Sequence, residues 1–182
     1  MLVLQDIQIG YDAQPIAKCV GHIAFAKAKF ITIIGANGAG KSTLLRSIAS
    51  GNHLISGNIS LHGKPIAEIP LTDLSQQISI LTTDRSISKS ITIYQLLEIS
   101  RAPYTNFLGS LTAADRAAID EVLIDFELVD LQYRQLSTLS DGQLQRALIA
   151  RALVQQTEYI LMDEPTNHLD IHHKAELLIK LK

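Results

Sequence analysis

The stretch that decides the fold is Gly35-Ala36-Asn37-Gly38-Ala39-Gly40-Lys41-Ser42. It matches G-x-x-x-x-G-K-[ST], a pattern in which backbone N–H groups of a glycine-rich loop surround phosphate oxygens. The apolar run Phe30–Ile34 precedes the loop and predicts a central strand buried on both faces. A helix is predicted from Ser42 to about Ser50. A plain glycine-rich turn is the alternative, but a chance match is expected only about once in a hundred such chains.

The chemistry of a nucleotide site explains the residue types in this loop. Lys41 can reach the β- and γ-phosphates as a mobile positive charge. The hydroxyl of Ser42 is suited to Mg²⁺, and the helix that follows presents its positive end. The sequence therefore predicts a site for ATP and Mg²⁺ formed by consecutive residues, namely Gly35, Ala36, Asn37, Gly38, Ala39, Gly40, Lys41, Ser42 and Thr43.

A second acidic motif follows another apolar run. Tyr159–Met162 predicts a buried strand, and Asp163 and Glu164 come directly after it. Asp163 can hold Mg²⁺ through a water, and Glu164 can orient or deprotonate an attacking water. Taken alone, this segment is better interpreted as an acidic turn. The phosphate loop earlier in the chain favours the catalytic interpretation, with Glu164 and Lys41 as catalytic residues.

Composition limits the classes of function. The chain has 182 residues, of which 47% are hydrophobic and 19% charged, which is typical of a globular protein with a core. A net charge of −2 does not suggest nucleic-acid binding. The single cysteine excludes an internal disulfide framework and fits a reducing compartment. No signal peptide or run of about 20 apolar residues is visible, so we expect a cytoplasmic protein whose membrane role depends on a partner.

Periodicity predicts an α/β chain that is interrupted by helices. Short strands are expected at residues 2–10 and 15–25, at 59–62 after a turn at 56–58, and at 78–81. The spacing of apolar residues over 84–152 predicts helices, and Thr112 with Asp115 predicts a helix N-cap there. A last helix is expected at 171–181. We therefore predict one domain, with an α/β nucleotide-binding core at 1–83 and 153–182 and a helical subdomain at 84–152.

The segment Leu139-Ser140-Asp141-Gly142-Gln143 stands before an amphipathic helix, about twenty residues ahead of Asp163. Here the chain resembles the ABC (ATP-binding cassette) ATPase family, whose LSGGQ signature lies between its two nucleotide motifs. The resemblance covers the whole chain. It implies a P-loop NTPase (RecA-like) core, an antiparallel β edge, an inserted helical subdomain and an ATPase activity.

The resemblance also implies roles for individual residues. Tyr11 matches the aromatic residue that stacks on adenine, although a strand-end tyrosine without that role is the alternative. Ser140, Gly142 and Gln143 match residues that contact the ATP held by the opposite subunit. The segment 167–170 resembles the loop that crosses the dimer interface. A head-to-tail homodimer that encloses two ATP molecules is therefore implied.

Within the family, Arg101–Gly109 resembles a segment in the ATPases of iron-chelate, haem and cobalamin importers. This similarity implies transmembrane permease subunits as partners, a substrate-binding protein as an indirect partner, and a peripheral location at the inner face of the cell membrane. Two alternatives stay open. One is a soluble ABC ATPase that acts on nucleic acid or ribosomes, and the other is a nucleotide-binding module with little turnover.

Three features depart from the family pattern. Thr83 stands where a glutamine that contacts Mg²⁺ is expected, so any contact with the metal would be closer or through water. Asp141 replaces the first glycine of the signature. The sequence ends at Lys182, before the strand that carries the family's switch histidine. We therefore interpret the chain as a cassette that is incomplete at its C-terminus and expect it to bind ATP but hydrolyse it slowly.

Overall fold

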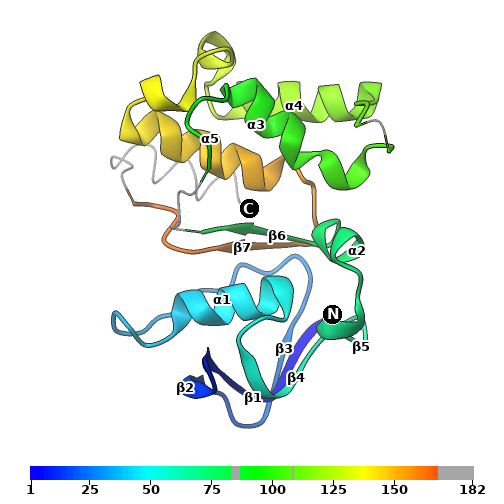
Figure 1. The fold of residues 1–182 in the computed structure, drawn as a ribbon, viewed down its shortest axis with the longest axis vertical. Helices are drawn as coiled ribbons and strands as arrows, with labels where there is room; N and C mark the ends of the chain where they lie inside the picture. Colours follow the sequence, from blue (N-terminus) through cyan, green and yellow to red (C-terminus); the bar gives the residue numbers. More distant parts are fainter. Residues whose placement is uncertain (83–86, 108, 168–182) are drawn as a thin grey trace.

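The computed structural model describes residues 1–82, 87–107 and 109–167. Its elements are stacked in layers, with α3, α4 and α5 above the strands β6 and β7, and α1 between these strands and an antiparallel sheet (Figure 1). The predicted Thr83 and the predicted helix at 171–181 lie outside the described residues. Among the residues that are described, no helix is long and apolar enough to cross a membrane.

The antiparallel sheet is built around β1 (Leu2–Tyr11). This strand pairs with β2 (Gln14–Lys18), β3 (His22–Phe25) and β4 (Leu54–Leu61), and β5 (Lys64–Pro65) extends the sheet beyond β4. The alternating apolar residues of β1 are buried and β-branched side chains are frequent, as a half-buried strand requires. The strand predicted at 2–10 is confirmed, whereas the single strand predicted at 15–25 is divided into β2 and β3, both of which pair with β1.

The turn predicted at residues 56–58 is wrong, because β4 continues through it. Gly57 has a φ of 86°, and a Cβ there would collide with the backbone carbonyl of Asp6 on the neighbouring strand. The register between β1 and β4 shifts at this point. Glycine therefore permits an irregularity within a strand at this position, because it tolerates the left-handed backbone and the close approach of Asp6. A glycine between polar residues is also typical of a turn, which explains the wrong prediction.

Strands β6 (Ile78–Leu81) and β7 (Tyr159–Met162) form a parallel pair with the register Ile78–Tyr159 to Leu81–Met162. Both strands are confirmed at the predicted residues. Successive side chains point to opposite faces of a strand. Ile78 accordingly belongs to the core shared with β1 and α1, whereas Leu81 belongs to the core of the helical layer. The pair is thus covered on both faces, as is usual for parallel strands.

The prediction of a buried central strand at Phe30–Ile34 is wrong in the structure. These residues form no strand, and the side chains of Phe30 and Ile34 are 65% and 90% exposed. A buried strand needs a neighbour that accepts and donates backbone hydrogen bonds. Within the described part of the chain, β7 pairs with β6 alone. An apolar run cannot reveal whether such a neighbour is present.

The helices agree with the prediction of a helix after the phosphate loop and of a helical stretch later in the chain. Helices α3, α4 and α5 each begin with a capping box, which satisfies N–H groups that the first turn leaves free. The helices are α1 (Lys41–Ser50), α2 (Leu71–Ser75), α3 (Ile93–Ser100), α4 (Ala113–Asp125) and α5 (Asp141–Leu153). Short 3-10 turns occupy Ile66–Glu68, Ala102–Tyr104, Val129–Leu131 and Leu136–Thr138.

Candidate functional site

The loop Gly35–Gly40 turns sharply before α1. The backbone N–H of Ala39 donates to the carbonyl of Ala36 at 3.2 Å, and Gly38 and Gly40 have φ values of 80° and 89°. A Cβ on Gly40 would lie 3.0 Å from the Cβ of Ala17. Gly40 is the N-cap of α1 and has no side chain that could cap the helix. No N-cap side chain therefore occupies the first N–H groups of α1, which suits an anion at this helix end.

Lys41 folds back across this loop. Its Nζ donates to the carbonyl oxygens of Gly35 at 2.9 Å and Ala36 at 2.8 Å. The ammonium group is thus held above the same backbone whose N–H groups would surround a phosphate. Because these acceptors are neutral carbonyls, a phosphate oxygen would be the stronger partner for this cation.

Tyr11, at the end of β1, lies next to the first turn of α1. A hydrogen bond with the Thr43 side chain lowers the pKa of the Tyr11 phenol, and Arg46 adds to this effect. On its other side, the Tyr11 ring lies 4.4 Å from the ring of His53, with the two planes tilted by 55°. Two residues predicted to bind the nucleotide, Tyr11 and Thr43, are therefore brought together, and His53 joins them without any signal in the sequence.

Asp163 lies directly after β7, where its backbone N–H donates to the carbonyl of Leu81 at 2.9 Å. Its side chain is buried, yet Oδ2 has no hydrogen-bond partner among the described residues. A buried carboxylate oxygen without a donor is costly unless a cation or a water completes it. The Asp163 carboxylate oxygen is suited to Mg²⁺ or to a water bound to it, because Mg²⁺ takes oxygen ligands and usually keeps several waters.

Glu164 is held in an unusual backbone conformation. Its φ is 51°, in the left-handed region that non-glycine residues rarely adopt. Asn167 fixes it twice, since its side-chain amide donates to Glu164 Oε2 at 2.5 Å and its backbone N–H donates to the Glu164 carbonyl at 3.1 Å. Strain of this kind is concentrated at functional sites. The exposed Glu164 side chain is thereby oriented next to the buried Asp163.

The signature residues begin α5. The Ser140 hydroxyl oxygen accepts the backbone N–H of Gln143 at 3.2 Å, and the Gln143 side chain accepts the backbone N–H of Ser140 at 3.0 Å. In this arrangement Ser140 uses an oxygen lone pair as the cap and keeps its own O–H proton for another acceptor. Asp141 and Gly142 form the first turn, where the negative charge of Asp141 is favourable.

The structure separates the signature helix from the phosphate loop. Helix α5 lies on one side of β6 and β7, and α1 lies on the other (Figure 1). The phosphate loop, Tyr11 and Thr43 are grouped at the start of α1, and Asp163 follows β7, which packs on α1. Ser140, Gly142 and Gln143 belong to the other layer.

Sequence reasoning missed a buried link between these layers. The side-chain amide of Gln145 in α5 donates to the carbonyl of Pro165 at 3.0 Å, directly after Asp163 and Glu164. Gln145 is only 5% exposed. Its position between Leu144 and Leu148 on an amphipathic helix was the available signal, because a buried glutamine needs a partner.

Comparisons with known proteins agree with this geometry. The ABC transporter family model matches residues 22–167. The chain is 38% identical over 175 residues to a probable siderophore transport system ATP-binding protein of Bacillus subtilis, covering 96% of this chain and 63% of that protein. It is 34% identical to an iron(3+)-hydroxamate import ATP-binding protein of the same species, covering 97% of this chain and 65% of that protein.

A solved structure of an ATP-binding subunit of an ABC transporter has the same fold. It superposes with a TM-score of 0.85 at 25% identity, covering 100% of this chain and 73% of that one. The chain thus spans less than two thirds of the length of the two curated relatives.

Proposed function

Because this chain belongs to the ABC transporter family, we propose that it binds and hydrolyses ATP as the nucleotide-binding part of a membrane importer. The observation that carries this proposal is the pairing of a phosphate loop, crossed by Lys41, with a buried carboxylate oxygen of Asp163 that lacks a donor among the described residues. The first feature is suited to phosphate, and the second to the cation that accompanies it.

In this proposal each residue has one task. The loop N–H groups and Lys41 hold the phosphates, Tyr11 stacks on the base, and Ser42 and Asp163 hold Mg²⁺ directly or through water. When bound, Mg²⁺ neutralises charge that develops on the phosphates. Glu164, oriented by Asn167, positions the attacking water and accepts its proton. Thr83 stays a proposed further contact to the metal.

We also propose a head-to-tail dimer. The separation of α5 from the phosphate loop supports this arrangement, because Ser140, Gly142 and Gln143 would then meet the nucleotide of the opposite subunit. The O–H proton of Ser140 is not used in the helix cap and can donate to a γ-phosphate oxygen. The two hydrophobic clusters, one among α3–α5 and one among β1, β4 and α1, support the proposed division into a nucleotide-binding core and a helical subdomain.

The proposed cargo is an iron-siderophore, haem or cobalamin-type compound, and the partners are permease subunits at the inner face of the membrane together with a substrate-binding protein. The two Bacillus subtilis relatives, which are named for siderophore and iron-hydroxamate transport, support iron chelates first.

The test begins with titration of a fluorescent ATP analogue with and without Mg²⁺, followed by a measurement of phosphate release. Binding that depends on Mg²⁺, together with slow or fast release, supports the ATPase. Binding without any release leaves a nucleotide-binding module instead. Co-purification with a membrane permease distinguishes the importer from a soluble ABC ATPase, which would instead co-purify with ribosomes or nucleic acid.

A further inference from the structure

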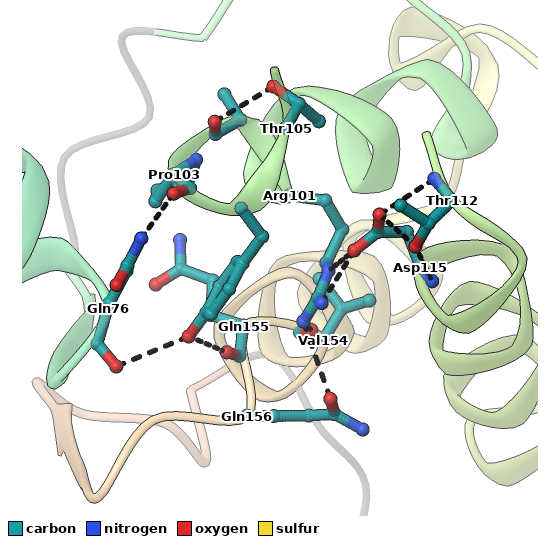
Figure 2. Close-up of polar contacts among 11 residues, drawn as sticks. Gln76, Arg101, Pro103, Thr105, Thr112, Asp115, Val154, Gln155 and Gln156 are labelled. Atoms are coloured by element: carbon teal, nitrogen blue, oxygen red, sulfur yellow. Dashed lines mark hydrogen bonds and ion pairs between the residues drawn. The ribbon is translucent and has the colours of Figure 1, made fainter. Parts of the chain in front are cut away.

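Helix α5 has the signature residues at one end and a dense set of polar contacts at the other (Figure 2). At this second end, Arg101 donates through Nη1 to the carbonyl of Val154 at 2.9 Å. Val154 is the C-cap of α5. The cation thus satisfies a carbonyl that the helix leaves free and lies at the negative end of the helix dipole.

Arg101 also connects two other helices. It stands at the C-terminal end of α3, and its Nε and Nη2 donate to Asp115 Oδ1 at 2.8 and 2.6 Å. Asp115 belongs to the first turn of α4, where its other oxygen accepts from the backbone and hydroxyl of Thr112. Arg101 and Asp115 are both buried. Three helix ends therefore meet at one ion pair.

Tyr104 extends this cluster to the strands. Its ring lies under the Arg101 guanidinium, with 4.0 Å between the guanidinium carbon and the ring centroid. Its hydroxyl lies 2.6 Å from the carbonyl of Gln155 and 3.2 Å from that of Gln76, so its single proton serves mainly Gln155. Gln76 is the C-cap of α2 and precedes β6, whereas Gln155 lies between α5 and β7. Burial raises the pKa of the Tyr104 phenol, so the proton is retained.

The side chain of a glutamine that precedes β6 adds a further contact to this cluster. The amide of Gln76 donates to the carbonyl of Pro103 at 2.5 Å (Figure 2). The backbone carbonyl of the same residue accepts from the Tyr104 hydroxyl. The segment Arg101–Tyr104 is thereby bound to the residues that precede β6 and β7 in the chain. The carboxyl ends of the same strands lead to the site of Asp163 and Glu164.

We propose that Arg101 and Tyr104 form a joint that fixes the C-terminal end of α5 to the entries of β6 and β7. The joint thereby sets where the signature residues at the other end of α5 stand relative to the phosphate loop. Helix α5 has 13 residues, so a small rotation at the joint is transmitted over a lever of about 20 Å. The expected effect on ATP turnover rests on the proposed function, whereas the expected effect on the distance between the layers does not.

The mechanical part is tested without nucleotide. In a Cys19→Ala background, spin labels at Asn52→Cys, after α1, and Glu121→Cys, on α4, report the distance between the two layers. We expect Tyr104→Phe, which keeps the ring over Arg101 but removes the hydroxyl, to shift or broaden the distance distribution. Tyr133→Phe removes an exposed tyrosine hydroxyl and is expected to leave it unchanged. Superimposable distributions for Tyr104→Phe and the unsubstituted protein would overturn the joint.

The functional part uses affinity and turnover. We expect Tyr104→Phe to keep the affinity for a fluorescent ATP analogue while phosphate release falls about three- to tenfold, the range that one hydrogen bond accounts for. Tyr159→Phe is the control, because its hydroxyl accepts from the backbone N–H of Leu2 and donates to the Phe25 carbonyl, both in the layer of the antiparallel sheet. An equal fall in turnover in both variants would mean general destabilisation and would contradict the joint. If the unsubstituted protein binds no analogue, the proposed function fails. The distance measurement still tests whether the joint fixes the position of α5.

Discussion

The side chain of Gln145 donates to the backbone carbonyl of Pro165 across 3.0 Å, and this bond joins helix α5 to the loop that carries Asp163 and Glu164. The helix that begins with the signature residues is therefore attached by a buried amide to the loop for which we propose a catalytic role. Because Glu164 already has a strained backbone, any support of the following residue helps to keep its carboxylate in place.

Replacing Gln145 with Met should slow phosphate release while leaving ATP affinity unchanged. Methionine keeps the volume and the apolar contacts of the stem but cannot donate to Pro165. The lost hydrogen bond accounts for a fall of about three- to tenfold in turnover. The measurement is single-turnover phosphate release beside an equilibrium titration of an ATP analogue.

The exposed Gln5 provides the control, because Gln5→Met makes the same chemical change on the surface of β1. A weaker affinity for the analogue in Gln145→Met would place this residue in nucleotide binding and contradict its role in holding the loop.

Lys41→Ala should weaken ATP binding. The Lys41 ammonium already contacts the loop carbonyls of Gly35 and Ala36, so it is in place to bond a phosphate oxygen. A hydrogen bond to a charged group contributes roughly 1.5–3 kcal/mol, which corresponds to about a ten- to hundredfold change in affinity. Titration of a fluorescent analogue measures it, with the exposed Lys64→Ala as the control. Equal affinities for Lys41→Ala and the unsubstituted protein would remove Lys41 from the site.

Gly40→Ala should destabilise the protein more than Gly63→Ala does. Both glycines have a positive φ, 89° and 83°, so both substitutions carry backbone strain of about 1–2 kcal/mol. Only at Gly40 would the new Cβ come within 3.0 Å of Ala17, whereas nothing lies within 4 Å at Gly63. Urea unfolding gives the loss of stability that each substitution causes. The difference between the two losses measures the cost of the contact between the new Cβ and Ala17. Equal losses would show that the phosphate loop tolerates a methyl group here.

The parts of the molecule that local pattern determines could be predicted. The phosphate loop, α1, β6 and β7 follow from a motif and from short apolar runs, and the helix cap at Thr112 follows from a spacing of three residues. In each case the residues that matter lie within one turn or one strand. The local prediction at Phe30–Ile34 failed because a strand depends on a neighbour that no local pattern contains.

The contacts that join the helices to one another and to the loop after β7 were not predictable, because they link residues far apart in the chain. Arg101 pairs with Asp115 across 14 positions, and Gln145 reaches Pro165 across 20. Sequence reasoning saw Asp115 as a cap and Arg101 as part of a family segment. Nothing in either pattern specifies the partner, since the approach of helix ends is decided by packing of the apolar faces between them.

Acid should weaken the fold through Asp115. The hydrogen bonds from Thr112, together with Arg101, lower the pKa of this carboxyl to about 2, below its ordinary value of about 3.9. A lowered pKa in the folded state means that the ionised carboxylate adds stability above about pH 4. This contribution is lost as the pH falls from about 4 towards 2. The free energy of unfolding should therefore differ more between the unsubstituted protein and Asp115→Asn at pH 7 than at pH 2.5, by roughly 2 kcal/mol.

Urea unfolding at both pH values measures this difference, and Asp125→Asn is the control because Asp125 is an exposed carboxylate of the same helix. Arg101→Met should be at least as damaging at pH 7, with a loss of about 3–5 kcal/mol, because it leaves the Asp115 carboxylate buried without its cation. Since Asp115 is then pushed towards protonation, the Arg101→Met protein should lose less stability on acidification than the unsubstituted one. A gap between Asp115→Asn and the unsubstituted protein that stays constant from pH 7 to pH 2.5 would mean that the ion pair does not stabilise the junction of these helices.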